Sequence, residues 1–198
     1  MPDGCVDAVW WQGFGVTIAG PDTTAKLIER SRGDLLIGIR FLPGAGGAAL
    51  GVPLNALRDL HVDARDVHPD FALDGELAPD EVLRRFVGLA ADLRSDPLVT
   101  EAVKRIGRQD VRSISRDLGM SERQLRRRFH AAVGYGPRTL ARVLRFGRFR
   151  TATNRGRTDL ASLAFDLGYS DQAHLTREVK DLSGLTPSQL IRGEDRNG

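Results

Sequence analysis

The chain of 198 residues is 41% hydrophobic and 28% charged, which is typical of a globular protein with one sizeable core or two small ones. No apolar run approaches the roughly 18 residues that a membrane-spanning helix needs. The N-terminus lacks the basic start and cleavage site of a secretory signal, so a cytoplasmic location is expected. The single cysteine, Cys5, excludes an internal disulfide and cannot build a thiolate-rich zinc site alone.

The formal net charge of +3 hides a strong asymmetry along the chain. Residues 1–103 carry 9 basic and 16 acidic side chains, residues 104–157 carry 16 and 3, and residues 158–198 carry 4 and 7. After Lys104, every basic side chain of the middle block is an arginine, whose forked guanidinium suits phosphates and guanine edges. The block therefore favours a nucleic-acid-binding surface. The alternative is a solvated run of charge.

The first part of the chain contains three β-like runs, VDAVWW, GVTIAG and LLIGIRF. The last run places Ile37, Ile39 and Phe41 on one face, which predicts a strand. The glycine-rich PGAGGAALGVP that follows lacks the Gly-Lys-Ser/Thr of a phosphate loop. It therefore predicts a turn that leads into a short helix near residues 53–60.

A polar, acidic connection over residues 63–78 precedes a predicted helix that begins at Pro79, with Asp80 and Glu81 in its first turn. The helix carries an apolar stripe formed by Val82, Leu83, Phe86, Leu89, Ala90 and Leu93. Such a stripe must pack against another surface. Packing within the chain is the simpler interpretation, and a contact with a second copy of the chain is the alternative.

From residue 97 onward the sequence predicts nearly continuous helix, and this part contains an internal repeat. At an offset of 49, Ser113, Ile114, Asp117, Leu118, Gly119 and Ser121 recur as Ser162, Leu163, Asp166, Leu167, Gly168 and Ser170. After a one-residue insertion, Leu125, Arg127, Gly134, Pro137 and Leu140 recur 50 residues later as Leu175, Arg177, Gly184, Pro187 and Leu190. Matches at a nearly constant offset indicate that the same helical unit is present twice.

Each unit has the outline of a helix-turn-helix, with a glycine in the tight turn between two helices. Gly119 and Gly168 are expected in that turn because glycine adopts a positive φ at little cost. The second helix needs a side-chain oxygen at its start to satisfy its free amides. Ser121 is the predicted cap in the first unit, and either Ser170 or Asp171 in the second.

The second helix of each unit has an apolar and a polar face. Two apolar pairs spaced four residues apart are predicted to face inward, Leu125 with Phe129 and Leu175 with Val179. The remaining positions point outward, namely Glu122, Arg123, Arg126 and Arg127 in the first unit and Gln172, Ala173, Thr176 and Arg177 in the second. Arginine pairs with guanine, glutamine with adenine, and small methyl groups contact the thymine methyl. Each second helix is therefore predicted to enter a major groove, whereas Arg128 is expected to lie along the protein surface.

Residues 97–192 resemble the DNA-binding domain of AraC/XylS-type transcriptional regulators. The likeness rests on the two helix-turn-helix units and on LAFDLGYSDQAHLTREVKDLSGLTPSQL, which carries the family's Gly-aromatic pair, Asp, Arg, Lys, Gly and closing Thr-Pro. Leu175 and Val179 stand where the family usually has phenylalanine, and Leu190 where tyrosine is common. These changes keep an apolar residue and affect packing more than function.

The resemblance implies an α+β protein with an all-α C-terminal domain, in which a long helix joins two helix-turn-helix units. The N-terminal motifs PDGCVDAVW, GPDT, GIRFLPGA and LGVPLNAL resemble the sensor region of some members, but about 75 residues are few for a complete barrel. A small β-rich, incomplete barrel is therefore predicted. Trp10, Trp11 and Phe14 are expected to close its core, with a ligand pocket as the alternative.

The predicted boundaries are residues 1–75 for the sensor-like region, 76–96 for a linker with a packing or dimer helix, 97–193 for the DNA-binding domain and 194–198 for a tail. The run from residue 137 to residue 152 fits the connecting helix, and it would span roughly 24 Å at about 1.5 Å per residue.

The resemblance also implies site residues. The positions that contact bases in the family correspond, in this chain, to Arg123, Arg127, Gln172, Ala173 and Arg177. Further base or phosphate contacts are expected from Ser121, Glu122, Arg126, Thr176, Arg138, Arg142 and Arg145.

The predicted function is that of a sequence-specific, double-stranded-DNA-binding transcription factor. Activators of this family commonly contact RNA polymerase as well as DNA, and a homodimer is a further expectation. No membrane contact, metal or cofactor is expected, and whether a small-molecule effector binds the N-terminal region is left open.

Two alternative functions belong to other classes of protein. A nonspecific architectural protein would not need the unlike side chains Gln172 and Ala173 in its second unit, and a DNA-repair methyl-acceptor enzyme would need a cysteine cluster.

Overall fold

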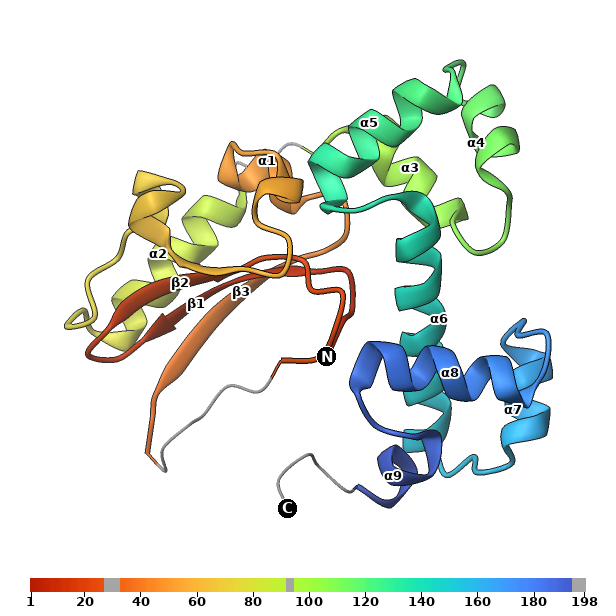
Figure 1. Ribbon diagram of the computed structural model, residues 1–198. Helices are drawn as coiled ribbons and strands as arrows, with labels where there is room; N and C mark the ends of the chain where they lie inside the picture. Colours follow the sequence, from red (N-terminus) through yellow and green to blue (C-terminus); the bar gives the residue numbers. More distant parts are fainter. Residues whose placement is uncertain (27–32, 92–94, 194–198) are drawn as a thin grey trace.

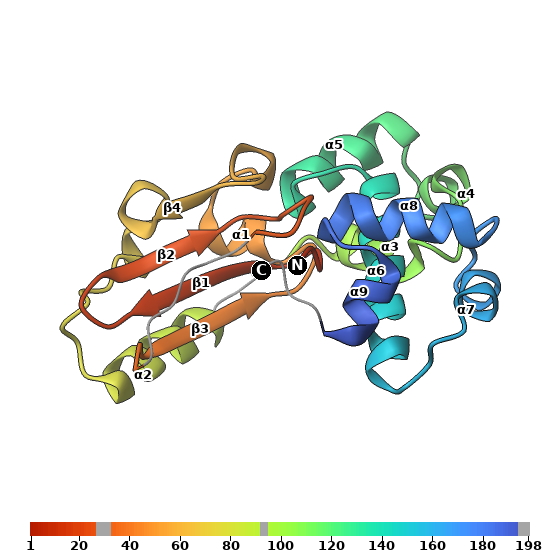
Figure 2. The same ribbon diagram turned by 60° about the horizontal axis from the view of Figure 1, so that its bottom comes forward.

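The computed structural model describes residues 1–26, 33–91 and 95–193, and it has a sheet-containing N-terminal part beside a helical C-terminal part (Figure 1). The four described strands are β1 (Val6–Trp11), β2 (Gly15–Ala19), β3 (Leu36–Phe41) and β4 (His61–Asp63). All pairings are antiparallel and the strand order is β3-β1-β2-β4. The sheet is open, as Figure 2 shows, which agrees with the predicted incomplete barrel.

The N-terminal core lies on one face of this sheet because alternate residues of β1 point into it. Val6, Ala8 and Trp10 are buried, whereas Asp7 and Val9 are partly exposed. The Trp10 indole Nε1 donates to the carbonyl oxygen of Asp74 at 2.8 Å, which satisfies its polar group inside the core.

The two other aromatic residues of this region lie differently. Trp11 is half-buried and Phe14 is 80% exposed, and their rings meet edge to face at 6.3 Å. Three aromatic residues were expected to close the core. Trp10 does lie in it, whereas Phe14 is exposed and Trp11 is only half-buried.

The middle of the chain contains more regular structure than the sequence predicted. The glycine-rich stretch itself forms a helix, α1 (Gly46–Leu50), and only the three-residue 3₁₀ helix η1 (Leu54–Ala56) follows it. The acidic connection is not a bare linker, because it contains β4 and the 3₁₀ helices η2 (Ala64–Asp66) and η3 (Pro69–Phe71). Apolar residues within it complete the core, since Phe71 and Leu73 are buried there.

The helix α2 (Pro79–Ala91) begins at the predicted proline and packs on the sheet. Val82 and Phe86 are buried in the N-terminal core and Leu89 packs against it, so this part of the predicted stripe packs within the chain, whereas Leu83 and Ala90 are exposed. Leu83 and Val87 lie on the outer face, 52% and 67% exposed. Leu93, the last predicted member of the stripe, lies outside the described residues.

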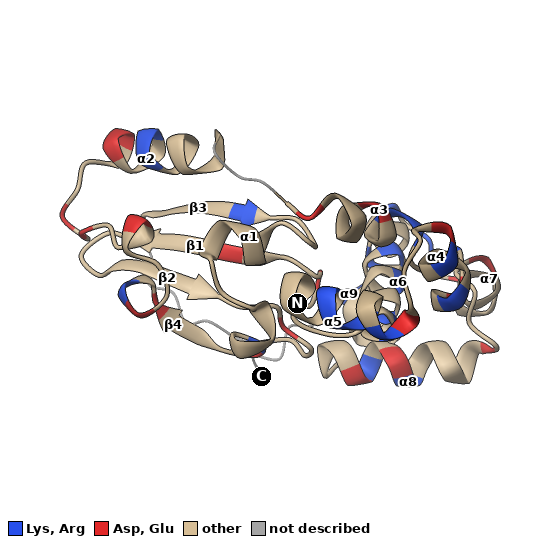
Figure 3. Ribbon diagram, turned by 90° about the horizontal axis from the view of Figure 1, so that it is seen from above, with Lys and Arg blue, Asp and Glu red and all other residues tan. Residues whose placement is uncertain are grey.

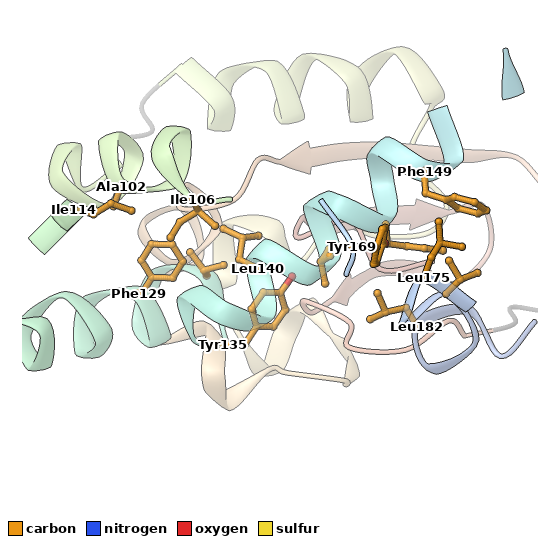
Figure 4. Packing of buried hydrophobic residues seen from close by; sticks show 14 of the residues in the cluster. Ala102, Ile106, Ile114, Phe129, Tyr135, Leu140, Phe149, Tyr169, Leu175 and Leu182 are labelled. Atoms are coloured by element: carbon orange, nitrogen blue, oxygen red, sulfur yellow. The ribbon is translucent and has the colours of Figure 1, made fainter. Parts of the chain in front are cut away.

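The C-terminal part is helical, as predicted. Its helices are α3 (Pro97–Arg105), α4 (Val111–Asp117), α5 (Glu122–Val133), α6 (Pro137–Asn154), α7 (Leu160–Asp166), α8 (Gln172–Ser183) and α9 (Pro187–Arg192). The long helix α6 joins one group formed by α3, α4 and α5 to another formed by α7, α8 and α9 (Figure 1). One continuous apolar cluster holds both groups, with Phe129 and Leu140 at one end of α6 and Phe149 and Leu175 at the other (Figure 4).

Candidate nucleic-acid interface

The first helix-turn-helix consists of α4 and α5, joined by a turn at Gly119. The φ angle of Gly119 is +67°, which is the conformation that glycine adopts most readily. Ser121 caps α5 in a reciprocal arrangement, because its Oγ accepts from the Gln124 amide at 3.2 Å while its own amide donates to Gln124 Oε1 at 2.8 Å. The start of α5 is therefore held by local interactions.

The second helix-turn-helix consists of α7 and α8, with Gly168 in the turn at a φ of +77°. The cap is Asp171, whose carboxylate accepts from the His174 amide at 2.6 Å. This hydrogen bond lowers the pKa of Asp171. Ser170 is therefore not the cap, and the one-residue insertion between the repeats lies in the turn before Asp171.

The second helix of the first unit, α5, presents the predicted faces. Leu125 and Phe129 are fully buried. Arg123, Arg126 and Arg127 are exposed. The neighbouring Glu122 is partly buried and pairs with Arg126 at 3.4 Å. An exposed pair at this distance contributes little to stability, so Arg126 remains available for another anion.

The second helix of the second unit, α8, is arranged alike. Gln172, Ala173 and Arg177 are exposed, and Leu175 and Val179 are fully buried. Thr176 is half-buried, and its hydroxyl donates to the carbonyl oxygen of Gln172 at 2.9 Å. Both helices therefore expose polar side chains near their N-terminal ends.

Arg128 on α5 does not share this exposed face. Its guanidinium pairs at 3.0 Å with Asp96, whose carboxylate also caps α3. The side chain thus ties α5 to α3, in line with the prediction that it lies along the protein surface.

Two arginines of α6 have internal partners that the sequence did not reveal. Glu178 on α8 is 4% exposed and receives hydrogen bonds from Arg145 Nε at 2.9 Å, Arg145 Nη2 at 2.7 Å and Arg142 Nε at 3.1 Å. Arg145 also lies over the ring of Tyr169, 4.5 Å from its centroid. Burial alone would raise the pKa of Glu178, but the hydrogen bonds from Arg145 and Arg142 outweigh it and lower the pKa.

This cluster changes the roles expected of α6. The side chain of Arg145 is 20% exposed and is used to hold α8 on α6. That of Arg142 is 42% exposed and also reaches Asp181 at 3.5 Å. Arg145 is thus placed as a link between helices, whereas Arg142 and the exposed Arg138 still reach the surface.

The basic side chains concentrate on the helical part, and few lie on the sheet (Figure 3). A cavity of about 530 Å³ near the start of α5 is lined by Arg108, Arg112, Arg126 and Arg138, among other residues. Arg138 also lines a hollow of about 620 Å³ between α6 and α8, together with Arg177. Arg138 therefore lies between the two exposed helix faces.

Arg108 and Arg112 were not among the predicted site residues. Both precede Ser113, the first matched position of the repeat, so the repeat gave no signal for them. Their membership in the arginine-rich block of residues 104–157 was the available signal.

Other kinds of site have no support among the residues that the structure describes. No group of three or more His, Cys, Asp or Glu side chains there could hold a metal ion, and no helix within those ranges is long and apolar enough to cross a bilayer. Cys5 is half-buried, and burial together with Asp3 raises the pKa of its thiol to about 12.

Comparison with known proteins agrees with this geometry. Residues 114–193 match the family described as helix-turn-helix domain, and residues 1–63 match a domain of unknown function, DUF6597. A curated relative from Mycobacterium tuberculosis, the probable bifunctional transcriptional activator/DNA repair enzyme AlkA, is 29% identical over 152 residues. The match covers 77% of this chain and 27% of the relative, so the chain spans about a quarter of that protein's length.

Three solved structures resemble parts or most of the chain. The C-terminal domain of AraT, a response regulator from Geobacillus stearothermophilus, is 19% identical with a TM-score of 0.46, covering 52% of this chain and 92% of that one. An AraC-type transcriptional regulator from Chromobacterium violaceum is 23% identical with a TM-score of 0.46, covering 52% and 96%. ToxT from Vibrio cholerae is 12% identical with a TM-score of 0.49, covering 97% and 91%.

The two helix-turn-helix units, their capped second helices and the domain match define a C-terminal helix-turn-helix domain, a kind of domain that binds DNA through its second helices. The match to this domain family covers residues 114–193, and the DUF6597 region at residues 1–63 precedes it.

Proposed function

We propose that this protein is a sequence-specific transcription factor that reads two adjacent major-groove segments of double-stranded DNA with α5 and α8. The observation that carries the proposal is the equivalent exposure of polar side chains near the N-terminal ends of both helices, at the two ends of one connecting helix. Helix-turn-helix proteins contact bases with this part of their second helix.

Base contacts are assigned to the exposed residues of that region. Arg123 and Arg127 on α5 and Arg177 on α8 suit guanine, Gln172 suits adenine, and the Ala173 methyl suits thymine. The two helices thus carry different base preferences, which favours two unlike half-sites.

Further base or phosphate contacts are assigned to the polar residues that flank these positions, namely Ser121, Glu122, Arg126, Thr176, Arg138 and Arg142. Among these, the Glu122 carboxylate only accepts hydrogen bonds, so it suits a cytosine amino group and not a phosphate. Among them Arg138 has the clearest place, because it lines the cavities on both sides of α6. Arg108 and Arg112 join the set through the cavity that they share with Arg126. Arg145 leaves it because its guanidinium is engaged with Glu178.

The connecting helix supports reading two groove segments. Its 18 residues span about 27 Å at 1.5 Å per residue. Successive major-groove segments on one side of B-DNA are about 34 Å apart, so the helix is close to the needed length and a modest bend of the DNA would make up the difference.

The test is selection of bound fragments from genomic DNA by the purified chain, at about physiological salt with excess competitor, followed by sequencing. Two enriched half-sites about 10 base pairs apart are expected. Salt-sensitive binding without an enriched motif would instead support the nonspecific architectural alternative.

A repair activity of this chain is not proposed, although the relative's name includes DNA repair. A methyl-acceptor mechanism needs a thiolate, and the raised pKa of Cys5 works against one. Incubation with alkylated DNA followed by mass spectrometry of the chain is expected to show no methyl transfer to Cys5.

The proposed organisation keeps residues 1–75 as a sensor-like region, 76–96 as linker and α2, and 97–193 as the DNA-binding domain, within a cytoplasmic protein. A homodimer would use the outer face of α2, where Leu83 and Val87 are exposed. RNA polymerase and a small-molecule effector are further partners to be tested once a DNA site is known.

A further inference from the structure

A short segment of the N-terminal part touches the C-terminal ends of both proposed recognition helices. We call residues 20–25, between β2 and the undescribed residues 27–32, the strap. Pro21 packs on Gly134, the residue that ends α5, so closely that a Cβ added to Gly134 would lie 2.2 Å from Pro21 Cγ. Four residues later, the Ala25 amide donates to the carbonyl oxygen of Leu182 in the last turn of α8 at 2.8 Å.

These two contacts occupy nearly equivalent places in the internal repeat. Gly134 and Gly184 end α5 and α8, both with positive φ, and Leu182 lies two residues before Gly184. The strap therefore joins the same end of the two helices. Four residue steps of chain reach at most about 14 Å, so the strap limits how far these ends can separate.

The strap is itself held to the rest of the N-terminal part. A Cβ on Gly20 would lie 1.8 Å from the carbonyl oxygen of Leu57, so only glycine fits there, and the Gly20 amide donates to the carbonyl oxygen of Leu60 at 2.9 Å. These contacts fix the first residue of the strap against the loop between η1 and β4.

Asp59 in that loop fixes the middle of the strap. Its carboxylate accepts from the Thr23 amide at 2.7 Å and from the Thr23 hydroxyl at 2.9 Å. Its backbone carbonyl accepts from Lys26 Nζ. The φ of Asp59 is +59°, a conformation that non-glycine residues adopt uncommonly, and the hydrogen bonds to the strap compensate for its cost.

A second contact fixes α5 on the N-terminal part of the chain. A Cβ on Gly47 of α1 would lie 2.8 Å from the carbonyl oxygen of Ala131 on α5, so the two helices meet at backbone distance. The strap in turn joins α8 to the N-terminal part through the hydrogen bond from Ala25 to Leu182. The position of α8 relative to α5 thus depends on two connections, the helix α6 and the strap.

We propose that the strap is a spacer that sets the separation of the two recognition helices, and that Thr23, Ala25 and Asp59 are positioning residues for DNA recognition. This rests on the proposed two-helix recognition. A fixed separation raises the effective concentration of the second helix at its half-site only when the half-site spacing matches, so the strap gives the protein its spacing preference.

The first test measures the separation without DNA. Nitroxide labels are placed on Arg127→Cys and Arg177→Cys, which are equivalent exposed positions, in a Cys5→Ser background. Pulsed electron spin resonance is expected to give a narrow distance distribution in this parent. The distribution should broaden in Ala25→Pro, which removes the amide donor, and in Asp59→Gly, which removes the carboxylate while tolerating a positive φ.

The matched control is Ala25→Ser, which keeps the amide and should leave the distribution narrow. Circular dichroism checks that each variant is folded, and Asp59→Gly decides the question if Ala25→Pro does not fold. An unchanged distribution in a folded Asp59→Gly protein would overturn the proposal.

The second test uses unlabelled protein and DNA with the two half-sites at the selected spacing or 2 base pairs farther apart. The parent's preference for the selected spacing should fall by about tenfold in Ala25→Pro and Asp59→Gly, with binding to a single half-site unchanged. An equal loss of affinity for the DNA with the selected spacing, the DNA with the longer spacing and the single half-site would contradict a spacer role. If the parent itself shows no spacing preference, two-helix recognition fails, while the distance measurement still decides whether the strap fixes α8.

Discussion

At the scale of single residues, the structure separates arginines that are exposed on the surface of α5 from arginines that connect one helix to another. Arg127 and Arg128 are neighbours on α5, yet Arg127 is exposed and forms no ion pair with the carboxylates of the described residues, while Arg128 pairs with Asp96. A direct test of the recognition face follows from this difference.

Arg127→Ala should weaken binding to the selected DNA by about 1 to 3 kcal/mol and relax the preference at one base position, because a bidentate contact with guanine is lost. Equilibrium binding to the motif and to its single-base variants measures both effects. Arg128→Ala is the control and should leave base preference unchanged. If Arg127→Ala changes neither affinity nor preference, the assigned face of α5 is wrong.

A second residue-scale prediction concerns the start of α8. Asp171→Ala should lower the free energy of unfolding by about 1 kcal/mol, because the His174 amide loses its acceptor. Ser170→Ala, one residue earlier, should have a smaller effect because Ser170 does not cap the helix. Urea denaturation of both variants measures the difference. Equal losses would contradict the cap assignment.

At the scale of elements, the buried carboxylate of Glu178 helps to hold α8 on α6. Its partners Arg142 and Arg145 come from α6, more than 30 residues earlier in the chain. Removing one member of a buried ion pair leaves the other charges poorly compensated. The recognition helix should therefore be sensitive to this position, although it lies on the inner side of α8.

Glu178→Gln should lower the free energy of unfolding at pH 7 by about 2 kcal/mol, whereas Asp181→Asn, in an exposed pair with Arg142, should change it by less than about 0.5 kcal/mol. Urea denaturation compares the two variants.

The pKa of Glu178 is lowered in the folded state, so the contribution of its charge to stability is present above the usual carboxyl pKa of about 4.3 and is lost as the pH falls below it. The difference between wild type and Glu178→Gln should accordingly shrink in acid. A difference that stays constant down to about pH 3 would show that the charge of Glu178 is not what stabilises the fold.

At the scale of the whole molecule, the arginine-rich surface between α5 and α8 is expected to provide the sequence-independent part of DNA affinity. Arg138→Ala should weaken binding to all sequences alike and reduce the slope of log K against log salt by about 1, because one phosphate contact is lost. Binding titrations at several salt concentrations, on DNA with and without the motif, measure both the affinity and the salt slope. A loss confined to the motif would instead assign Arg138 to base readout.

Much of the C-terminal domain could be predicted from the sequence because its determinants are local. The turn glycines, the cap at Ser121 and the inward apolar pairs lie within a few residues of one another, and the 49- and 50-residue offsets repeat them. The strands β1, β2 and β3 were likewise indicated by short β-like runs in the sequence, of which the third alternates between two faces.

Only the tertiary structure decided the features that depend on residues far apart in the chain. Arg145 and Arg127 look alike in the sequence, and the difference arises because Glu178, 33 residues away, lies beside Arg145. The acidic connection contributes Phe71 to the core because it folds back over the sheet. The contacts of Pro21 with the end of α5 and of Ala25 with α8 join residues more than 100 positions apart. Periodicity reports which face of an element is buried, and packing alone determines what that face meets.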